Sequence, residues 1–143
     1  MEDKSLKAIF SAAAAAFSIY FNMLAVPVAV LIAAMAADYL TGLYSAYINR
    51  CLSSKTGLKG IIKKLGYLML IAAAMFADYL IHAGFQYVNI KMDCSFWAGI
   101  LVTFWLIVNE LISIIENLIK TDIPVPKFLL TLIAQLKDRI EKR

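Results

Sequence analysis

The sequence predicts an all-α integral membrane protein with three transmembrane helices, an N-terminal alanine-rich helix and a C-terminal amphipathic cytoplasmic helix. Of its 143 residues, 62% are hydrophobic and only 17% are charged, whereas soluble domains are about half apolar and about a quarter charged. The charged residues gather in short clusters between long apolar stretches. A helix needs about 20 apolar residues to cross a hydrocarbon layer of about 30 Å, so we expect three or four crossings within one domain, residues 1–143.

Three stretches are long and apolar enough to span the membrane, and each is bounded by charged residues or by glycine. They are residues 26–49, 65–84 and 96–119. Pro27 stands early in the first stretch, where a helix tolerates proline. Pro124 and Pro126 follow the third stretch, and they end it because proline cannot continue a helix and biases the residue before it toward an extended conformation.

The two ends of the chain predict helices of other kinds. Residues 5–22 are rich in alanine and short for a span, so we favour a peripheral or shallow helix, with a fourth crossing as the alternative. In residues 126–143 the apolar side chains recur at steps of three and four between charged ones, which is typical of an amphipathic helix. This helix either lies on the inner leaflet or mediates subunit assembly.

Basic residues predict the orientation in the membrane. The segment between the first two spans holds five bases and no acid, and the tail from Lys120 onward holds six bases and three acids. Short loops rich in lysine and arginine stay in the cytoplasm, so we place this loop and the C-terminus there. The expected contacts of the loop are anionic lipid headgroups rather than nucleic acid. Its bases are Arg50, Lys55, Lys59, Lys63 and Lys64.

Three acids inside the predicted spans are the strongest functional signal, because a carboxylate in hydrocarbon costs several kcal/mol. Asp38 lies roughly 18 Å from Arg50, Asp78 roughly 21 Å from Lys64, and Glu110 roughly 15 Å from Lys120, counted along each helix. We therefore expect one polar layer, with no base at its depth. It either lines a water-filled lumen or hydrogen-bonds the helices together. Its predicted members are Asp38, Thr41, Asp78, Asn109, Glu110 and Ser113.

Small side chains recur every four residues along the first span, and such stripes let helices approach closely in lipid. The predicted packing residues are Ala29, Ala33, Ala37 and Gly42. The contact is either with the second span of the same chain or with another subunit.

The sequence offers no sign of catalysis. Cys51, Cys94 and His82 lack the spacing of a metal or redox site, and the predicted topology puts the two cysteines on opposite sides of the membrane. No nucleophile lies beside a base, and no glycine-rich phosphate loop occurs. We expect neither enzyme activity nor a cofactor.

An ordered set of motifs resembles the phage holins of the toxin-secretion and phage-lysis type. The motifs are Asp38-Tyr-Leu-Thr-Gly42, Ser53-Ser-Lys-Thr-Gly57-Leu-Lys-Gly60 with Lys63-Lys64, Asp78, Asn109-Glu-Leu-Ile-Ser-Ile-Ile-Glu-Asn117 and Pro124-Val-Pro126. The resemblance implies a homo-oligomeric lesion in the bacterial inner membrane, through which an endolysin or a large protein toxin passes. Two alternatives stay open, namely a small ion or proton channel or transporter, and a noncatalytic membrane scaffold.

Overall fold

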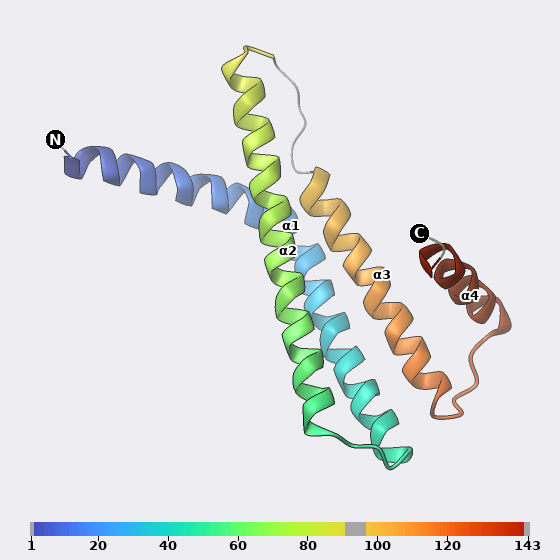
Figure 1. Ribbon diagram of the computed structural model, residues 1–143. Coiled ribbons are helices and arrows are strands. Elements are labelled where there is room, and N and C mark those ends of the chain that lie inside the picture. The colour runs from blue at the N-terminus through green and yellow to red at the C-terminus, as the bar shows by residue number, and fades with distance from the viewer. Residues whose placement is uncertain (1, 91–96, 142–143) are drawn as a thin grey trace.

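The structure is a computed structural model that describes residues 2–90 and 97–141. This part of the chain forms four α-helices and no strand: α1 (Glu2–Ile48), α2 (Ser54–Tyr87), α3 (Trp97–Ile119) and α4 (Lys127–Glu141). Figure 1 shows the second half of α1 running alongside α2 and α3, with α4 set apart from them. The predicted all-α fold class is confirmed.

Three helical segments among the described residues are long and apolar enough to cross a membrane: Leu24–Ile48, Ser54–Tyr87 and Trp97–Ile119. The second differs from its prediction, because helix begins at Ser54 rather than at Leu65. Gly57 and Gly60 do not interrupt it, since glycine inside a helix costs only about 1 kcal/mol. The lysines assigned to a loop therefore lie on the first turns of α2, and the connection from α1 is short.

Helix α1 is continuous where the sequence predicted two separate helices, 5–22 and 26–49. It runs through Pro27, although proline removes one intrahelical hydrogen bond and commonly bends a helix. In Figure 1 the N-terminal part of α1 turns away from the bundle that its second half joins. The peripheral location of that first part stays a prediction.

Alternating steps of three and four residues place one face of each long helix inside the bundle. In α1 the inward series is Leu31, Met35, Asp38, Gly42 and Ser45; in α2 it is Lys64, Tyr67, Ile71, Met75 and Asp78; in α3 it is Gly99, Thr103, Leu106, Glu110, Ser113 and Asn117. This spacing is that of helices packed side by side at a shallow angle.

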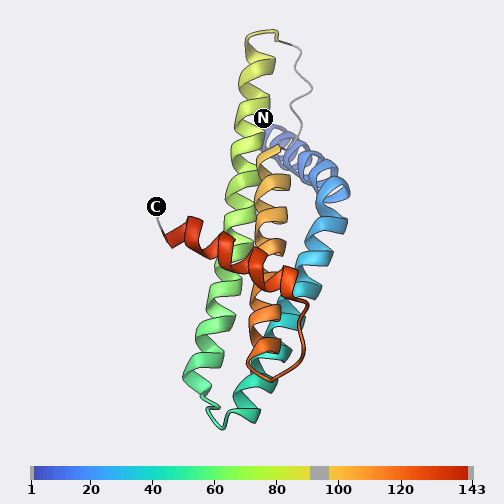
Figure 2. The same cartoon turned by 90° about the vertical axis from the view of Figure 1, so that its right-hand side faces the viewer.

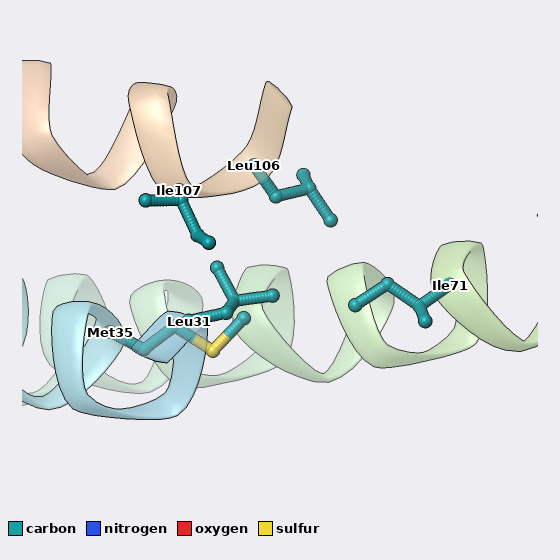
Figure 3. Close-up of a cluster of buried hydrophobic side chains, with 5 residues drawn as sticks. All are labelled: Leu31, Met35, Ile71, Leu106 and Ile107. Atoms are coloured by element: carbon teal, nitrogen blue, oxygen red, sulfur yellow. The ribbon is translucent and has the colours of Figure 1, made fainter. Parts of the chain in front are cut away.

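Helix α3 holds the bundle together, because it packs against both α1 and α2 while those two contact each other less. Figure 2 shows the three helices from the side. The apolar centre joins all of them, with Leu31 and Met35 from α1, Ile71 from α2, and Leu106 and Ile107 from α3 (Figure 3). Many large apolar side chains point outward, as expected of helices whose solvent is lipid.

All three long helices end in the same backbone arrangement. Arg50, Asn89 and Asp122 have φ values of 54°, 55° and 57°. After α1, for example, the Arg50 and Cys51 amides donate to the carbonyls of Tyr47 and Ala46. These are the two bonds of a Schellman motif, which pairs carbonyls that the helix itself leaves unpaired. Each of the three helices thus has a well-defined C-terminal end.

Helix α4 begins directly after Pro126, close to the predicted boundary, and lies at an angle to the three long helices (Figure 2). Among its described side chains Ile133 is buried and Leu129 is half-buried, whereas Phe128 and Leu132 are exposed. The apolar residues Leu136 and Ile140 of the predicted stripe lie outside the residues whose side chains are described. Its contact with lipid or with another subunit stays a prediction.

Candidate functional site

Lys64 lies between two acids from two other helices and joins all three long helices. Its ammonium donates a hydrogen bond to Asp38 Oδ2 at 2.9 Å and another to Glu110 Oε2. The Lys64 and Asp38 side chains are each 16% exposed, and that of Glu110 is 5% exposed. The expectation that no base reaches these acids is therefore wrong. The lysine was assigned to a surface loop, but α2 begins early and turns it inward.

Asn117 of α3 extends this cluster on the α1 side. Its Nδ2 group donates to Asp38 Oδ1 at 3.1 Å, while the Thr41 hydroxyl donates to the carbonyls of Ala37 and Asp38. Both oxygens of the Asp38 carboxylate thus accept hydrogen bonds, one from α2 and one from α3. A carboxylate bonded in this way is far less costly to bury than an isolated one.

Gly42 makes the approach of Asn117 possible. A Cβ atom at Gly42 would lie 3.3 Å from Asn117 Nδ2, a distance that would push the amide away. This predicted packing residue therefore contacts α3 rather than α2. Of the other members of the stripe, Ala37 is half-buried, while Ala29 and Ala33 are exposed on the bundle surface.

Asp78 of α2 lies beside the opposite end of α3, where it caps the helix instead of forming an ion pair. Its Oδ1 and Oδ2 atoms accept hydrogen bonds from the Ala98 and Gly99 amides at 3.0 and 2.8 Å. These amides belong to the first turn of α3, where backbone donors have no partner within the helix and the helix dipole favours negative charge. Glu110 lies 11 residues further on, about 16 Å along the axis. The sequence predicted one polar layer containing all three acids, but in the structure Asp78 lies at a different depth from Asp38 and Glu110.

Gly99 fits closely beneath this carboxylate. An added Cβ would lie 3.2 Å from Leu24 Cδ1 of α1 and 3.4 Å from Asp78 Oδ2. The Gly99 carbonyl in turn accepts a hydrogen bond from the buried Thr103 hydroxyl at 2.7 Å. The start of α3 is thus held by α1 and α2 together.

Two cavities flank the lysine and its partners. The larger has a volume of about 720 Å³ and the smaller about 350 Å³. Asp38, Lys64, Gly60 and Ser113 line both of them. Asn109, predicted for the polar layer, lines the smaller cavity and is half-buried. The polar centre therefore borders both cavities.

The other bases of the predicted loop are exposed. Lys55 and Lys59 lie on the first turns of α2, and Arg50 lies in the connection before it. Lys63 places its ammonium 5.6 Å from the centre of the Tyr67 ring, within range of a cation–π interaction. Their contact with lipid headgroups stays a prediction.

The site brings together hydrogen-bonding and charged groups rather than a recognisable reaction centre. Within the described residues no three His, Cys, Asp or Glu side chains cluster in a way that could hold a metal ion. Cys51 is exposed with a free thiol, and Cys94 lies outside the described residues. Sequence reasoning missed Lys64, although its place in the inward series of α2 with Ile71 and Asp78 was readable.

We expect Lys64→Met to destabilise the bundle by about 3–5 kcal/mol, because it leaves two carboxylates buried side by side without their cation. The control is Lys63→Met at the preceding residue, whose side chain is exposed, and this change should cost no more than about 1 kcal/mol. Reversible unfolding of the purified protein in mixed micelles measures both. Adding Glu110→Gln to Lys64→Met should recover part of the loss, and equal effects of the two lysine changes would contradict the central role of Lys64.

Asp78→Asn should lower the free energy of unfolding by about 1–2 kcal/mol, since the amide has only one oxygen for the two backbone donors of α3. The same change at the exposed Asp122 is the control. Asparagine tolerates the left-handed backbone conformation found there, so Asp122→Asn should cost nothing measurable. Hydrogen exchange at the Ala98 and Gly99 amides should speed up in the first variant alone; unchanged exchange would refute the capping role.

Comparison with known proteins agrees with the sequence motifs and the helical fold. Residues 15–138 match the bacteriophage holin family. An uncharacterized protein of Listeria innocua is 38% identical over 120 residues, which cover 83% of this chain and 77% of the relative. An uncharacterized protein of Halalkalibacterium halodurans is 33% identical over 87% of each chain. An uncharacterized 14.9 kDa protein from the nagH 3′ region of Clostridium perfringens is 29% identical over 86% of each chain.

No solved structure matches this chain significantly. The family match nevertheless covers most of the sequence, including α2, α3 and the second half of α1. The three long apolar helices agree with it. The chain is therefore a multi-pass membrane protein that belongs to the bacteriophage holin family.

Proposed function

We propose that copies of this chain assemble in the bacterial cytoplasmic membrane into a lesion wide enough for an endolysin or a large protein toxin to pass. The observation that carries the proposal is the polar centre of an otherwise apolar bundle, in which Asp38, Lys64, Glu110 and Asn117 bond to one another across three helices. Family membership supports pore formation and lysis as the general role. No catalytic step is part of the proposal.

A water-filled lesion needs helices with one polar face, and α3 carries such a face. Its polar residues are Asn109, Glu110, Ser113, Glu116 and Asn117, all buried or half-buried in the single chain. In one copy this face is covered by α1 and α2, while the outer surface is suited to lipid. In the proposed assembly the same face turns toward water between copies, where hydration replaces the hydrogen bonds made within the bundle.

The proposed orientation follows from the basic residues. Arg50, Lys55 and Lys59 are exposed near the connection between α1 and α2, and short basic segments of this kind remain cytoplasmic. They would contact anionic headgroups of the inner leaflet. Since α2 and α3 would return the chain to the same side, we expect the C-terminus in the cytoplasm as well.

A narrow proton or ion channel is the second candidate, and the two cavities beside Lys64 favour it. Both cavities border the charged centre, and a conduction path through the bundle would pass beside such charged groups. The two candidates differ in the size of what crosses the membrane.

Expression of this chain together with a cytoplasmic endolysin should cause abrupt loss of culture turbidity, because the enzyme gains access to the cell wall. Purified protein should also release an entrapped folded protein from lipid vesicles. Steady growth despite accumulation of the chain in the membrane would contradict the proposal. Proton current without release of the entrapped protein would favour the narrow channel instead.

In a Cys94→Ser background, Cys51 should react with a membrane-impermeant thiol reagent in inside-out vesicles but not in intact spheroplasts, because its exposed side chain lies beside Arg50 in the basic connection. The counterpart is Cys51→Ser, in which Cys94 should show the reverse pattern. Reaction of Cys51 from the outer face would overturn the proposed orientation.

A further inference from the structure

The larger cavity, of about 720 Å³, lies where the second half of α1, the first turns of α2 and the last turns of α3 meet. Its volume falls within the range of about 300–1,000 Å³ typical of sites for small molecules and cofactors. Glycines on two helices, Gly42 and Gly57 among them, contribute to the space. The cavity is thus a feature of the single chain that the proposed pore does not require.

One end of this cavity adjoins the Asp38–Lys64–Glu110 cluster, whose net charge is negative, although Glu110 itself lines only the smaller cavity. Asp38 lines the larger cavity beside Lys64, and Lys64 also binds Glu110, so two carboxylates share one ammonium. At a depth where unbalanced charge is expensive, a second cationic group that donates hydrogen bonds would be favoured. Each Asp38 oxygen accepts one bond from the protein and has a further lone pair available.

The other end of the cavity carries hydrogen-bond donors and positive charge. Lys120, on the turn that ends α3, lines it together with Ser53 and Thr56 at the start of α2. The Ser53 side chain makes no capping bond to α2. Lys120 follows Asn117, the partner of Asp38, by three residues, which is about 4.5 Å along the helix axis. The two ends therefore favour opposite charges about one helical turn apart.

The rim of the cavity is apolar. Tyr39 and Leu43 of α1 and Leu52 of the connection line it, and all three side chains are exposed. These residues belong to or adjoin segments suited to lie in a membrane. A lipid with a small zwitterionic headgroup matches the two charged ends and the apolar rim. Its headgroup would occupy the cavity, and its acyl chains would pass over the rim into the bilayer.

We propose that this cavity binds the headgroup of an aminophospholipid, with phosphatidylethanolamine as the matching chemistry. The primary ammonium donates to Asp38, and the phosphate accepts from Lys120 and from the Ser53 and Thr56 hydroxyls. Phosphatidylglycerol lacks the ammonium, and phosphatidylcholine has a bulkier ammonium without N–H donors. This binding does not depend on pore formation, so failure of either proposal leaves the other standing.

Native mass spectrometry of the full-length protein released from detergent micelles tests the selectivity. The probes are phosphatidylethanolamine, phosphatidylglycerol and phosphatidylcholine with identical acyl chains, and free phosphoethanolamine as the soluble form of the same head. We expect the first lipid to bind about tenfold more tightly than the other two, which corresponds to one charge-assisted hydrogen bond. Equal affinity for the three lipids, or preference for phosphatidylglycerol, would overturn the proposal. If free phosphoethanolamine bound as tightly as phosphatidylethanolamine, the proposal that the occupant is a membrane lipid would be overturned.

Gly60→Leu tests the location, with Gly66→Leu on the same helix as the matched control. Neither glycine has an atom within 4 Å of an added Cβ, but only Gly60 lines the cavity. The first variant should weaken phosphatidylethanolamine binding at least tenfold, the second less than twofold, and both should retain native helix content by circular dichroism. Identical affinities in the two variants would place the lipid elsewhere.

Lys120→Gln tests the phosphate end of the site, and Lys127→Gln, an exposed lysine outside the cavity lining, is its control. We expect a loss of about tenfold in phosphatidylethanolamine affinity from the first change alone, because a charged hydrogen bond to phosphate is lost. Equal losses in the two variants would show general attraction of lipid to positive charge and would overturn the assigned site.

Discussion

The packing of the three long helices against one another depends on the two ion pairs made by the Lys64 ammonium. The ammonium bonds Asp38 of α1 and Glu110 of α3 from its own position on α2, although α1 and α2 otherwise contact each other little. A buried ion cluster gives little net stability compared with apolar packing, but loss of one member is costly. The cluster therefore fixes which faces of the helices meet, while Leu31, Ile71 and Leu106 supply the close packing at the centre.

Buried polar groups need hydrogen-bond partners, and this requirement also explains the contacts at the two ends of α3. Asp78 accepts hydrogen bonds from the first backbone donors of the helix. At the other end the Asn117 amide donates to Asp38 of α1, and the Lys120 carbonyl accepts from the side-chain amide of Asn49, directly after α1. In lipid no water is present to replace the buried bonds of Asp78 and Asp38, so the loss of either costs several kcal/mol. Close approach is possible because Gly42 and Gly99 have no side chain where the partners lie.

Much of this structure could be predicted from the sequence, because long apolar stretches with proline and charged ends have few alternatives. The three spans, the buried acids Asp38, Asp78 and Glu110, and the family were all readable in this way. The partners of those acids could not be predicted in this way. The depth of each acid in the membrane was counted from the nearest charged residue, and Lys64 was assumed to lie at the membrane surface. Counting steps of three and four back from Ile71 would have placed Lys64 inward. The partner of Asp78 is a backbone turn on another helix, and residue types alone carry no sign of such a contact.

The unequal lengths of α2 and α3 have a consequence for how the bundle sits in a bilayer. Helix α3, with 23 residues, is about 34 Å long and nearly matches the hydrocarbon thickness, whereas α2, with 34 residues, is about 51 Å long. Since α3 is tied to its neighbours near both ends, it sets the immersion of the whole bundle, and the surplus of α2 must stand in the headgroup region or beyond it. Thickening of the bilayer would therefore strain α3 first, because it is the shorter span, and with it the contacts that Asp78 and Asn117 make near its two ends.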